Sequence, residues 1–204
     1  LLPKPKTAFG RVILANGSRL SLAKAECADG RTLTATTLYN TRLSIPLEEV
    51  IALYLFQGRA TYLSDLKPRR IEGKPFGNLD WPLVADASVS GLDLRLAGSC
   101  YDKGLGLHSE SRVTYNLAGG YHWFEALVGL EEQSNGKTGS ARVKILVDGK
   151  PKPVDGDEEL TGKSKPLAVR LDVQGAKELT LVVEFGKRGD ILGRVNWIDA
   201  RLIK

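Results

Sequence analysis

The chain has 204 residues, of which 42% are hydrophobic and 26% are charged, a balance that allows a buried core and excludes wholesale disorder. No apolar run approaches the roughly 18 residues needed to cross a bilayer, so we expect no membrane span. The formal net charge of +5 comes from residues 1–75, where twelve Lys and Arg are set against six Asp and Glu, and their scattered positions favour a solvated surface over a nucleic-acid site.

The first 66 residues show a pattern of short strands. Asn16-Gly17 and Asp29-Gly30 separate the first three of them, and both dipeptides suit hairpin turns because their residues tolerate positive φ. The expected strands are 11–14, 19–22, 32–38, 42–45 and 50–56. We therefore expect a small β unit over residues 1–66, either barrel-like or a curled sheet.

Residues 67–78 form the expected connection to a second unit. They contain Pro68, Gly73, Pro75 and Gly77 and have little periodic apolar content, which is typical of a linker. From residue 79 to residue 204, apolar and polar residues alternate again. The clearest alternating segments are 92–96, 112–117, 121–130, 143–147, 167–173, 179–185 and 194–203. About seven strands with one apolar face each predict two packed sheets, so we assign residues 79–204 to an all-β sandwich.

The chain lacks the sequence patterns of common catalytic sites. It has two histidines and contains no G-x-S-x-G, H-E-x-x-H or G-x-x-x-x-G-K motif. Glu131-Glu132 and Glu158-Glu159 are paired carboxylates, so a glycosidase remains an alternative. Glycosidic cleavage needs two carboxylates that converge across a cleft, whereas neighbouring residues on a strand point to opposite faces. We therefore expect a protein that is not an enzyme.

Residues 101–112 (YDKGLGLHSESR) gather side chains that suit a sugar. We expect a glycine-rich loop in which the backbone can approach a ligand closely. It would present an aromatic ring, an imidazole and two cations, namely Tyr101, His108, Lys103 and Arg112. Two interpretations of His108 stay open: contact with a ligand, or a hydrogen bond to backbone within a structural loop.

Several segments together resemble the NPCBM family, whose name stands for novel putative carbohydrate-binding module and which is related to the family 51 carbohydrate-binding modules. The matching segments are 101–112, 113–117 (VTYNL), 119–129 (GGYHWFEALVG), 143–149 (VKILVDG), 175–183 (GAKELTLVV) and 196–202 (NWIDARL). They agree with the family in order and spacing, and the resemblance covers about residues 76–204. Two departures are Ser109, where the family commonly has Ala, and Glu131-Glu132, where the family pair is rich in Asp.

The resemblance implies a galactose-binding-like jelly roll that recognises galactose-type sugars without catalysing a reaction. It also implies a secreted, periplasmic or cell-surface location beside a secreted protein or enzyme. The alternative function is an interaction or scaffold protein whose basic N-terminal unit docks a protein partner.

Two tryptophans are candidates for stacking against a sugar ring. Trp81 lies in an irregular stretch before the first strand of the sandwich, and Trp123 shares a strand face with polar residues, whereas Trp197 is in phase with the core. We expect a sugar to bind at a loop end of the sandwich near Tyr101 and His108.

The sequence indicates metal and disulfide sites less clearly than it indicates the sugar site. Jelly-roll modules often hold a structural calcium in loop oxygens, and the weak candidates for its ligands are Asp80, Asp86 and Asp199. Cys27 and Cys100 match no metal pattern, and both a disulfide and two free thiols remain open.

Overall fold

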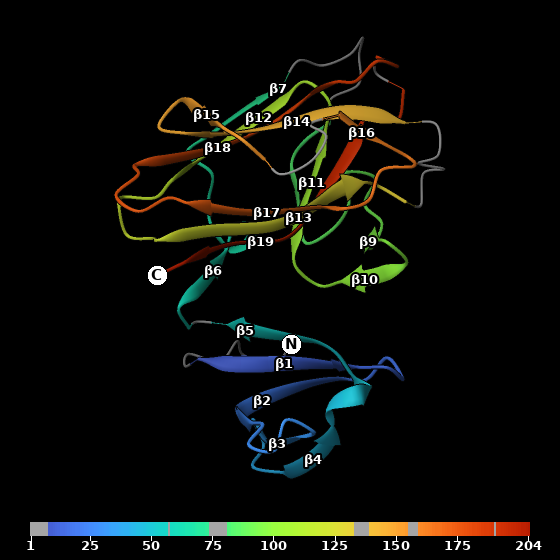
Figure 1. Ribbon diagram of the computed structural model, residues 1–204, viewed down its shortest axis with the longest axis vertical. Coiled ribbons are helices and arrows are strands. Elements are labelled where there is room, and N and C mark those ends of the chain that lie inside the picture. Colours follow the sequence, from blue (N-terminus) through green and yellow to red (C-terminus); the bar gives the residue numbers. More distant parts are fainter. Residues whose placement is uncertain (1–7, 57, 74–80, 133–138, 155–158, 190) are drawn as a thin grey trace. The chain divides into compact units, whose positions relative to one another are not determined.

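The structure is a computed structural model that describes residues 8–56, 58–73, 81–132, 139–154, 159–189 and 191–204 (Figure 1). These residues form strands β1 to β19 and two short 3-10 helices, so the predicted all-β class is confirmed. Among them, no helix is both long and hydrophobic enough to cross a membrane. The chain divides into two compact units, Leu1–Thr61 and Tyr62–Lys204, and each is described separately below.

The first unit is one antiparallel sheet of five strands with the order β4-β3-β2-β1-β5. Its strands are β1 (Phe9–Leu14), β2 (Arg19–Glu26), β3 (Thr32–Thr37), β4 (Arg42–Pro46) and β5 (Val50–Phe56), with the 3-10 helix η1 (Leu47–Glu49) before β5. Gly17 and Gly30 have φ of 83° and 67°, as expected for the predicted turns. A small core of Val12, Leu22, Leu33 and Ile45 covers one face. Since β4 and β5 end the order of the described strands, the sheet is open and does not close into a barrel.

The second unit is a sandwich of two sheets, visible as two layers in Figure 1. Sheet I has the order β17-β13-β19-β11-β8, and sheet II has the order β15-β14-β18-β12-β7, with β16 paired to β14. The strands of sheet I are β8 (Val84–Ala85), β11 (Gly104–His108), β13 (Trp123–Leu130), β17 (Leu167–Asp172) and β19 (Arg194–Ile203). Those of sheet II are β7 (Arg70–Gly73), β12 (Ser111–Asn116), β14 (Ser140–Val147), β15 (Lys150–Lys152), β16 (Glu159–Thr161) and β18 (Glu178–Phe185).

Four short elements complete the described chain. Strand β6 (Ala60–Tyr62) spans the boundary between the two units, and the 3-10 helix η2 (Leu63–Asp65) lies at the start of the second unit. Strand β9 (Leu94–Leu96) pairs with β10 (Ser99–Tyr101) as a separate hairpin. Cys27 and Cys100 are free thiols and belong to different units.

The division of the chain differs from the predicted boundary. Residues 70–73 of the expected connection form β7, which pairs with β12 of sheet II, and residues 74–78 lie outside the described residues. The sequence hides β7 because three of its four residues are Arg70, Glu72 and Gly73, which leaves one apolar residue and no alternation to recognise.

Alternating residues of the two sheets build the core of the sandwich. Leu107, Phe124, Val195 and Trp197 point inward from sheet I and meet the inward residues of sheet II. Trp197 is fully buried, which confirms its predicted place in the core. Burial of each such side chain contributes roughly 1.5–3 kcal/mol, so this core accounts for the stability of the sandwich.

The predicted glycine-rich loop at 101–112 is wrong in its central part. Residues Gly104–His108 form β11, a buried strand between β19 and β8. The glycines are there for close packing, because a Cβ at Gly104 would lie 2.6 Å from the Trp197 carbonyl oxygen and one at Gly106 would lie 2.2 Å from the Val89 nitrogen. Glycine at every second position removes the polar half of the alternation that marks a strand, which is why the segment resembled a loop.

This packing predicts the effect of adding one methyl group. Gly106→Ala should lower the free energy of unfolding of the sandwich by about 1–3 kcal/mol, because the new Cβ meets backbone atoms that cannot rotate away. Urea unfolding followed by tryptophan fluorescence measures this, since all three tryptophans lie in the second unit. Gly120→Ala is the matched control, because its Cβ would meet nothing closer than 3.6 Å. Equal stability of the two variants would contradict the packing argument.

Candidate functional site

Three strands of sheet I place a histidine, an arginine and a glutamate side by side. His108 of β11 pairs with Arg194 of β19, and the Glu131 nitrogen, directly after β13, donates to the Arg194 carbonyl oxygen at 2.9 Å. Their neighbours Leu107 and Val195 point into the core, so the three side chains project from the outer face of the sheet. We call His108, Arg194 and Glu131 the His–Arg–Glu row.

Trp81 packs against this row. Its ring stacks on the imidazole of His108 with a centroid separation of 4.8 Å and an interplanar angle of 7°. The guanidinium carbon of Arg194 lies 4.9 Å from the same ring, within the range of a cation–π interaction. Trp81 is therefore positioned by two polar side chains of the row while part of its surface remains exposed.

A hydrogen-bonded network holds the charges of the row in place. Glu131 is 2% exposed, and its two oxygens accept from Ser88 Oγ at 2.8 Å and Ser90 Oγ at 2.9 Å. Arg194 Nη1 donates to Ser90 Oγ at 2.8 Å and lies 3.8 Å from a Glu131 oxygen. A buried carboxylate needs such hydrogen-bond partners. The same network holds the Arg194 guanidinium in one position at the surface. His108 Nδ1 lies 3.3 Å from the Ser109 carbonyl oxygen, which can only accept.

The neighbouring row on the same face of sheet I consists of Gly106, Asn196 and Gly129, and it lets other segments pack beside the His–Arg–Glu row. Gly106 and Gly129 both pair with Asn196, one from each side. Without side chains at these two positions, residues 88–89 approach Gly106 and the side chain of Leu96 covers Gly129. Buried Asn196 donates through Nδ2 to the Arg95 carbonyl oxygen at 3.4 Å. The two glycines thus allow residues 88–89 and strand β9 to lie against the sheet beside the row.

A groove of about 500 Å³ adjoins the row at Glu131. It is lined by Ala97, Glu132, Thr161, Ser164 and Lys165, among others. Glu132 accepts from the Gly98 nitrogen through both oxygens at 3.1 Å. Hydroxyl, carboxylate and ammonium groups around apolar side chains give the groove the mixed character that suits a small hydroxylated ligand.

The structure brings together two of the five side chains that the sequence predicted as sugar contacts. Trp81 and His108 stack in the site, but Arg112 projects from the outer face of sheet II. Trp123 lies at the far end of β13 from Glu131, with Arg170 4.7 Å from its ring. Tyr101 packs on the β9–β10 hairpin cluster, where burial and the Asp199 carboxylate raise the pKa of its hydroxyl.

Nothing in the local sequence marks Arg194 and Glu131 as neighbours of His108. Eighty-five residues lie between His108 and Arg194 along the chain, and the register of β11 on β19 brings the two side chains together. The sequence marks Glu131 as one of a pair of carboxylates and as a departure from the family's Asp-rich pair, and neither observation links it to His108. No local pattern in the sequence reports a strand register of this kind.

The candidate calcium ligands do not form a calcium site in the described residues. The ammonium of buried Lys103 lies between Asp86 Oδ2 at 2.7 Å and Asp65 Oδ1 at 2.8 Å, where it supplies the positive charge. Asp80 lies outside the described residues. No group of three or more His, Cys, Asp or Glu side chains among them is arranged to hold a metal ion. Asp86 thus serves an internal ion pair, and Asp199 belongs to no such group among the described residues.

Comparison with known proteins adds independent findings. A model of the NPCBM/NEW2 domain family matches residues 59–203, and no curated protein sequence matches the chain. The CBM51 of Clostridium perfringens GH95, solved in complex with methyl-galactose, is 27% identical with a TM-score of 0.62, over 70% of this chain and 99% of that one. The CBM51-2 and INT domains of Clostridium perfringens ZmpB, solved with GlcNAc, are 22% identical with a TM-score of 0.64 over 95% of this chain. The chain spans 43% of the length of that ZmpB structure.

Asp199, one of the candidate metal ligands, predicts a pH dependence of stability. Burial raises the pKa of this carboxyl to about 6, although Arg201 opposes the shift. Because the folded pKa is above the unfolded value near 4, Asp199 stabilises the fold at low pH, and this contribution is lost as the pH rises through about 6. Asp199→Asn should therefore raise the free energy of unfolding at pH 7 by about 1–3 kcal/mol and leave it unchanged near pH 3.

The measurement is the difference between variant and wild type in urea unfolding across this pH range, because other groups titrate equally in both. Asparagine also tolerates the φ of 49° at this position. A difference that does not vary with pH would contradict a raised pKa.

Proposed function

The chain belongs to the NPCBM/NEW2 domain family, and on this basis we propose that it binds carbohydrate without catalysing a reaction, with a galactose-type sugar held at the His–Arg–Glu row. The family match over residues 59–203 supports the class of function. The complex of the Clostridium perfringens GH95 module with methyl-galactose supports the choice of sugar.

The observation that carries the proposal is the joint position of Trp81 and Arg194. A pyranose ring has one face of C–H groups, which packs on an indole, and a rim of hydroxyls, which accept from a guanidinium and donate to a carboxylate. The Arg194 side chain is 22% exposed, so it can reach a ligand, and Glu131 and Ser90 hold it in one orientation. In this proposal the stacked imidazole of His108 holds the Trp81 ring in place.

The positions of the paired carboxylates support a binding role over hydrolysis. Glu131 is engaged by two serines inside the fold, and Glu132 binds the Gly98 nitrogen on the exposed side. Glu159 accepts from the Lys187 nitrogen at 2.8 Å, a hydrogen bond that lowers the pKa of its carboxyl. Glu158 lies outside the described residues. Each described member of these pairs thus already serves a structural contact.

We further propose a secreted, periplasmic or cell-surface location, where a glycan ligand is accessible. The alternative role as an interaction or scaffold protein has one supporting observation. Ile51, Leu53 and Leu55 on edge strand β5 are 59%, 41% and 56% exposed, and an exposed apolar strip of this kind suits a protein partner. Both roles are compatible in one chain because they use different units.

Replacement of the two accessible tryptophans tests where the sugar binds. We expect wild-type protein to bind methyl-galactose with a dissociation constant on the order of 0.1–1 mM, or about 4–5.5 kcal/mol. Trp81→Ala should weaken binding at least tenfold by removing the stacking surface, whereas Trp123→Ala should leave it unchanged. Titration calorimetry gives the constants, and thermal melts show whether each variant is folded. If only Trp123→Ala lost binding, the sugar would bind at the other end of β13 and the proposed site would be wrong.

We also expect that the protein does not hydrolyse galactosides. Chromogenic galactosides incubated with the protein should release no product above the buffer rate, because no two described carboxylates of the pairs remain available to act together. Release that disappears in Glu131→Gln would establish a hydrolase and overturn the non-catalytic assignment.

A further inference from the structure

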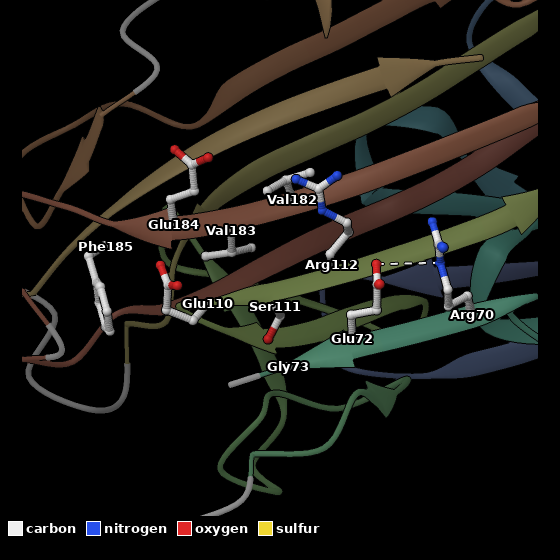
Figure 2. A pocket seen from close by; sticks show the side chains of 10 residues that line it. All are labelled: Arg70, Glu72, Gly73, Glu110, Ser111, Arg112, Val182, Val183, Glu184 and Phe185. Atoms are coloured by element: carbon white, nitrogen blue, oxygen red, sulfur yellow. Dashed lines mark ion pairs between the residues drawn. The ribbon is translucent and has the colours of Figure 1, made fainter. Parts of the chain in front are cut away.

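A second groove lies on the outer face of sheet II, away from the His–Arg–Glu row. It has a volume of about 560 Å³, within the usual range of ligand sites. Strands β7, β12 and β18 run side by side beneath it. Figure 2 shows the side chains that matter for its chemistry: Arg70, Glu72, Glu110, Arg112, Val182 and Glu184.

Strand register places one arginine at the centre of this groove. Arg112 of β12 pairs with Glu72 of β7 on one side and with Val182 of β18 on the other. The flanking residue Val113 points into the core, so Arg112 and its two partners project outward. Glu184 follows two residues after Val182 on the same face, and Glu110 stands two residues before Arg112. An arginine is thus surrounded by three carboxylates on a sheet surface.

The groove contains polar side chains that have no partner among the described residues. Val182 is only 4% exposed although it points outward, because the longer side chains around it cover its sides. The side chains of Arg112 and Glu110 form neither a hydrogen bond nor an ion pair with any described residue. Glu72 pairs with Arg70 at 3.4 Å and Glu184 with Lys144 at 2.7 Å. A guanidinium and a carboxylate therefore remain available to a ligand in the groove.

This lining gives no preference for charged ligands. Arg70 and Lys144 balance Glu72 and Glu184, and Arg112 balances Glu110, so the groove has no excess charge that would attract a phosphate, a sulfate or a cationic peptide. A neutral polyhydroxylated ligand needs no such excess, since one hydroxyl can accept from Arg112 while its neighbour donates to Glu110. The C–H groups of a sugar ring would pack on the partly exposed ring of Phe185 at the end of the groove.

We propose that the groove at Arg112 is a second saccharide site, which makes this module bivalent. The choice of ligand class rests on the proposed function, but the groove shares no residue with the His–Arg–Glu row. Only residues 109 and 110 separate His108 at the end of β11 from Ser111 at the start of β12. This corner, in which Glu110 has a φ of 61°, sends the chain from sheet I to sheet II. The two sites therefore flank one end of the sandwich on opposite faces.

Amide-resolved NMR titration of the full chain tests the proposal. The probes are methyl-galactose, GlcNAc and lactose, each at millimolar concentration. The indole N–H of Trp81 reports on the row, and the backbone amides of Arg112, Val182 and Glu184 report on the groove. The Trp81→Ala protein removes the first site, and in that background the groove amides should still shift and saturate. Adding Arg112→Ala should then raise the dissociation constant at least tenfold.

Arg142→Ala is the matched control, because Arg142 is also an exposed arginine on sheet II but lies outside the groove. It should bind as tightly as its parent, and thermal melts should show all variants folded. Complete loss of groove shifts in Trp81→Ala would overturn the second site and leave the proposed function intact. Groove shifts without any response of Trp81 would support the second site and refute the row. No response to any of the three sugars, or saturation by a lysine-rich peptide instead, would overturn the second site.

Discussion

The pairing of β19 with β11 on one side and with β13 on the other is the interaction on which the candidate site depends. Each ladder fixes its neighbours about 4.8 Å apart, so residues at equivalent positions must share a face. That arrangement sets Gly106, Asn196 and Gly129 in one row and His108, Arg194 and Glu131 in the next. The glycine row lets other segments lie against the sheet, and those segments supply the serines that orient the charged row.

Alternation of apolar residues predicted most of the sandwich because one face of each strand fills the core. It failed at β11, where glycines occupy the outward positions, and at β7, where only Ile71 is apolar. Trp81 and His108 were identified because aromatic and imidazole groups suggest sugar chemistry by themselves. Their contact with each other, and their link to Arg194, depend on register and on a loop position that no local pattern encodes.

The charged side chains of the second unit fall into two groups that differ in function. Lys103 with Asp65 and Asp86, and Glu131 with its serines, satisfy one another inside the fold and hold segments together. Their partial burial makes them costly to break. Arg112 and Glu110 have no such partners among the described residues. Residue type alone grouped His108 with Arg112, because it does not distinguish a side chain with partners in the fold from one without them.

The corner at residues 109–110 also constrains how this sequence can change. Side chains on a strand alternate between its two faces, and the corner is too short to absorb an insertion. One extra residue there would reverse the phase of β12 unless the whole strand slipped, which would bring Arg112 into the core and expel Val113 and Tyr115. The length of this connection is thus under stronger constraint than the identity of Ser109, and insertions that lengthen the loops of this module are best tolerated elsewhere.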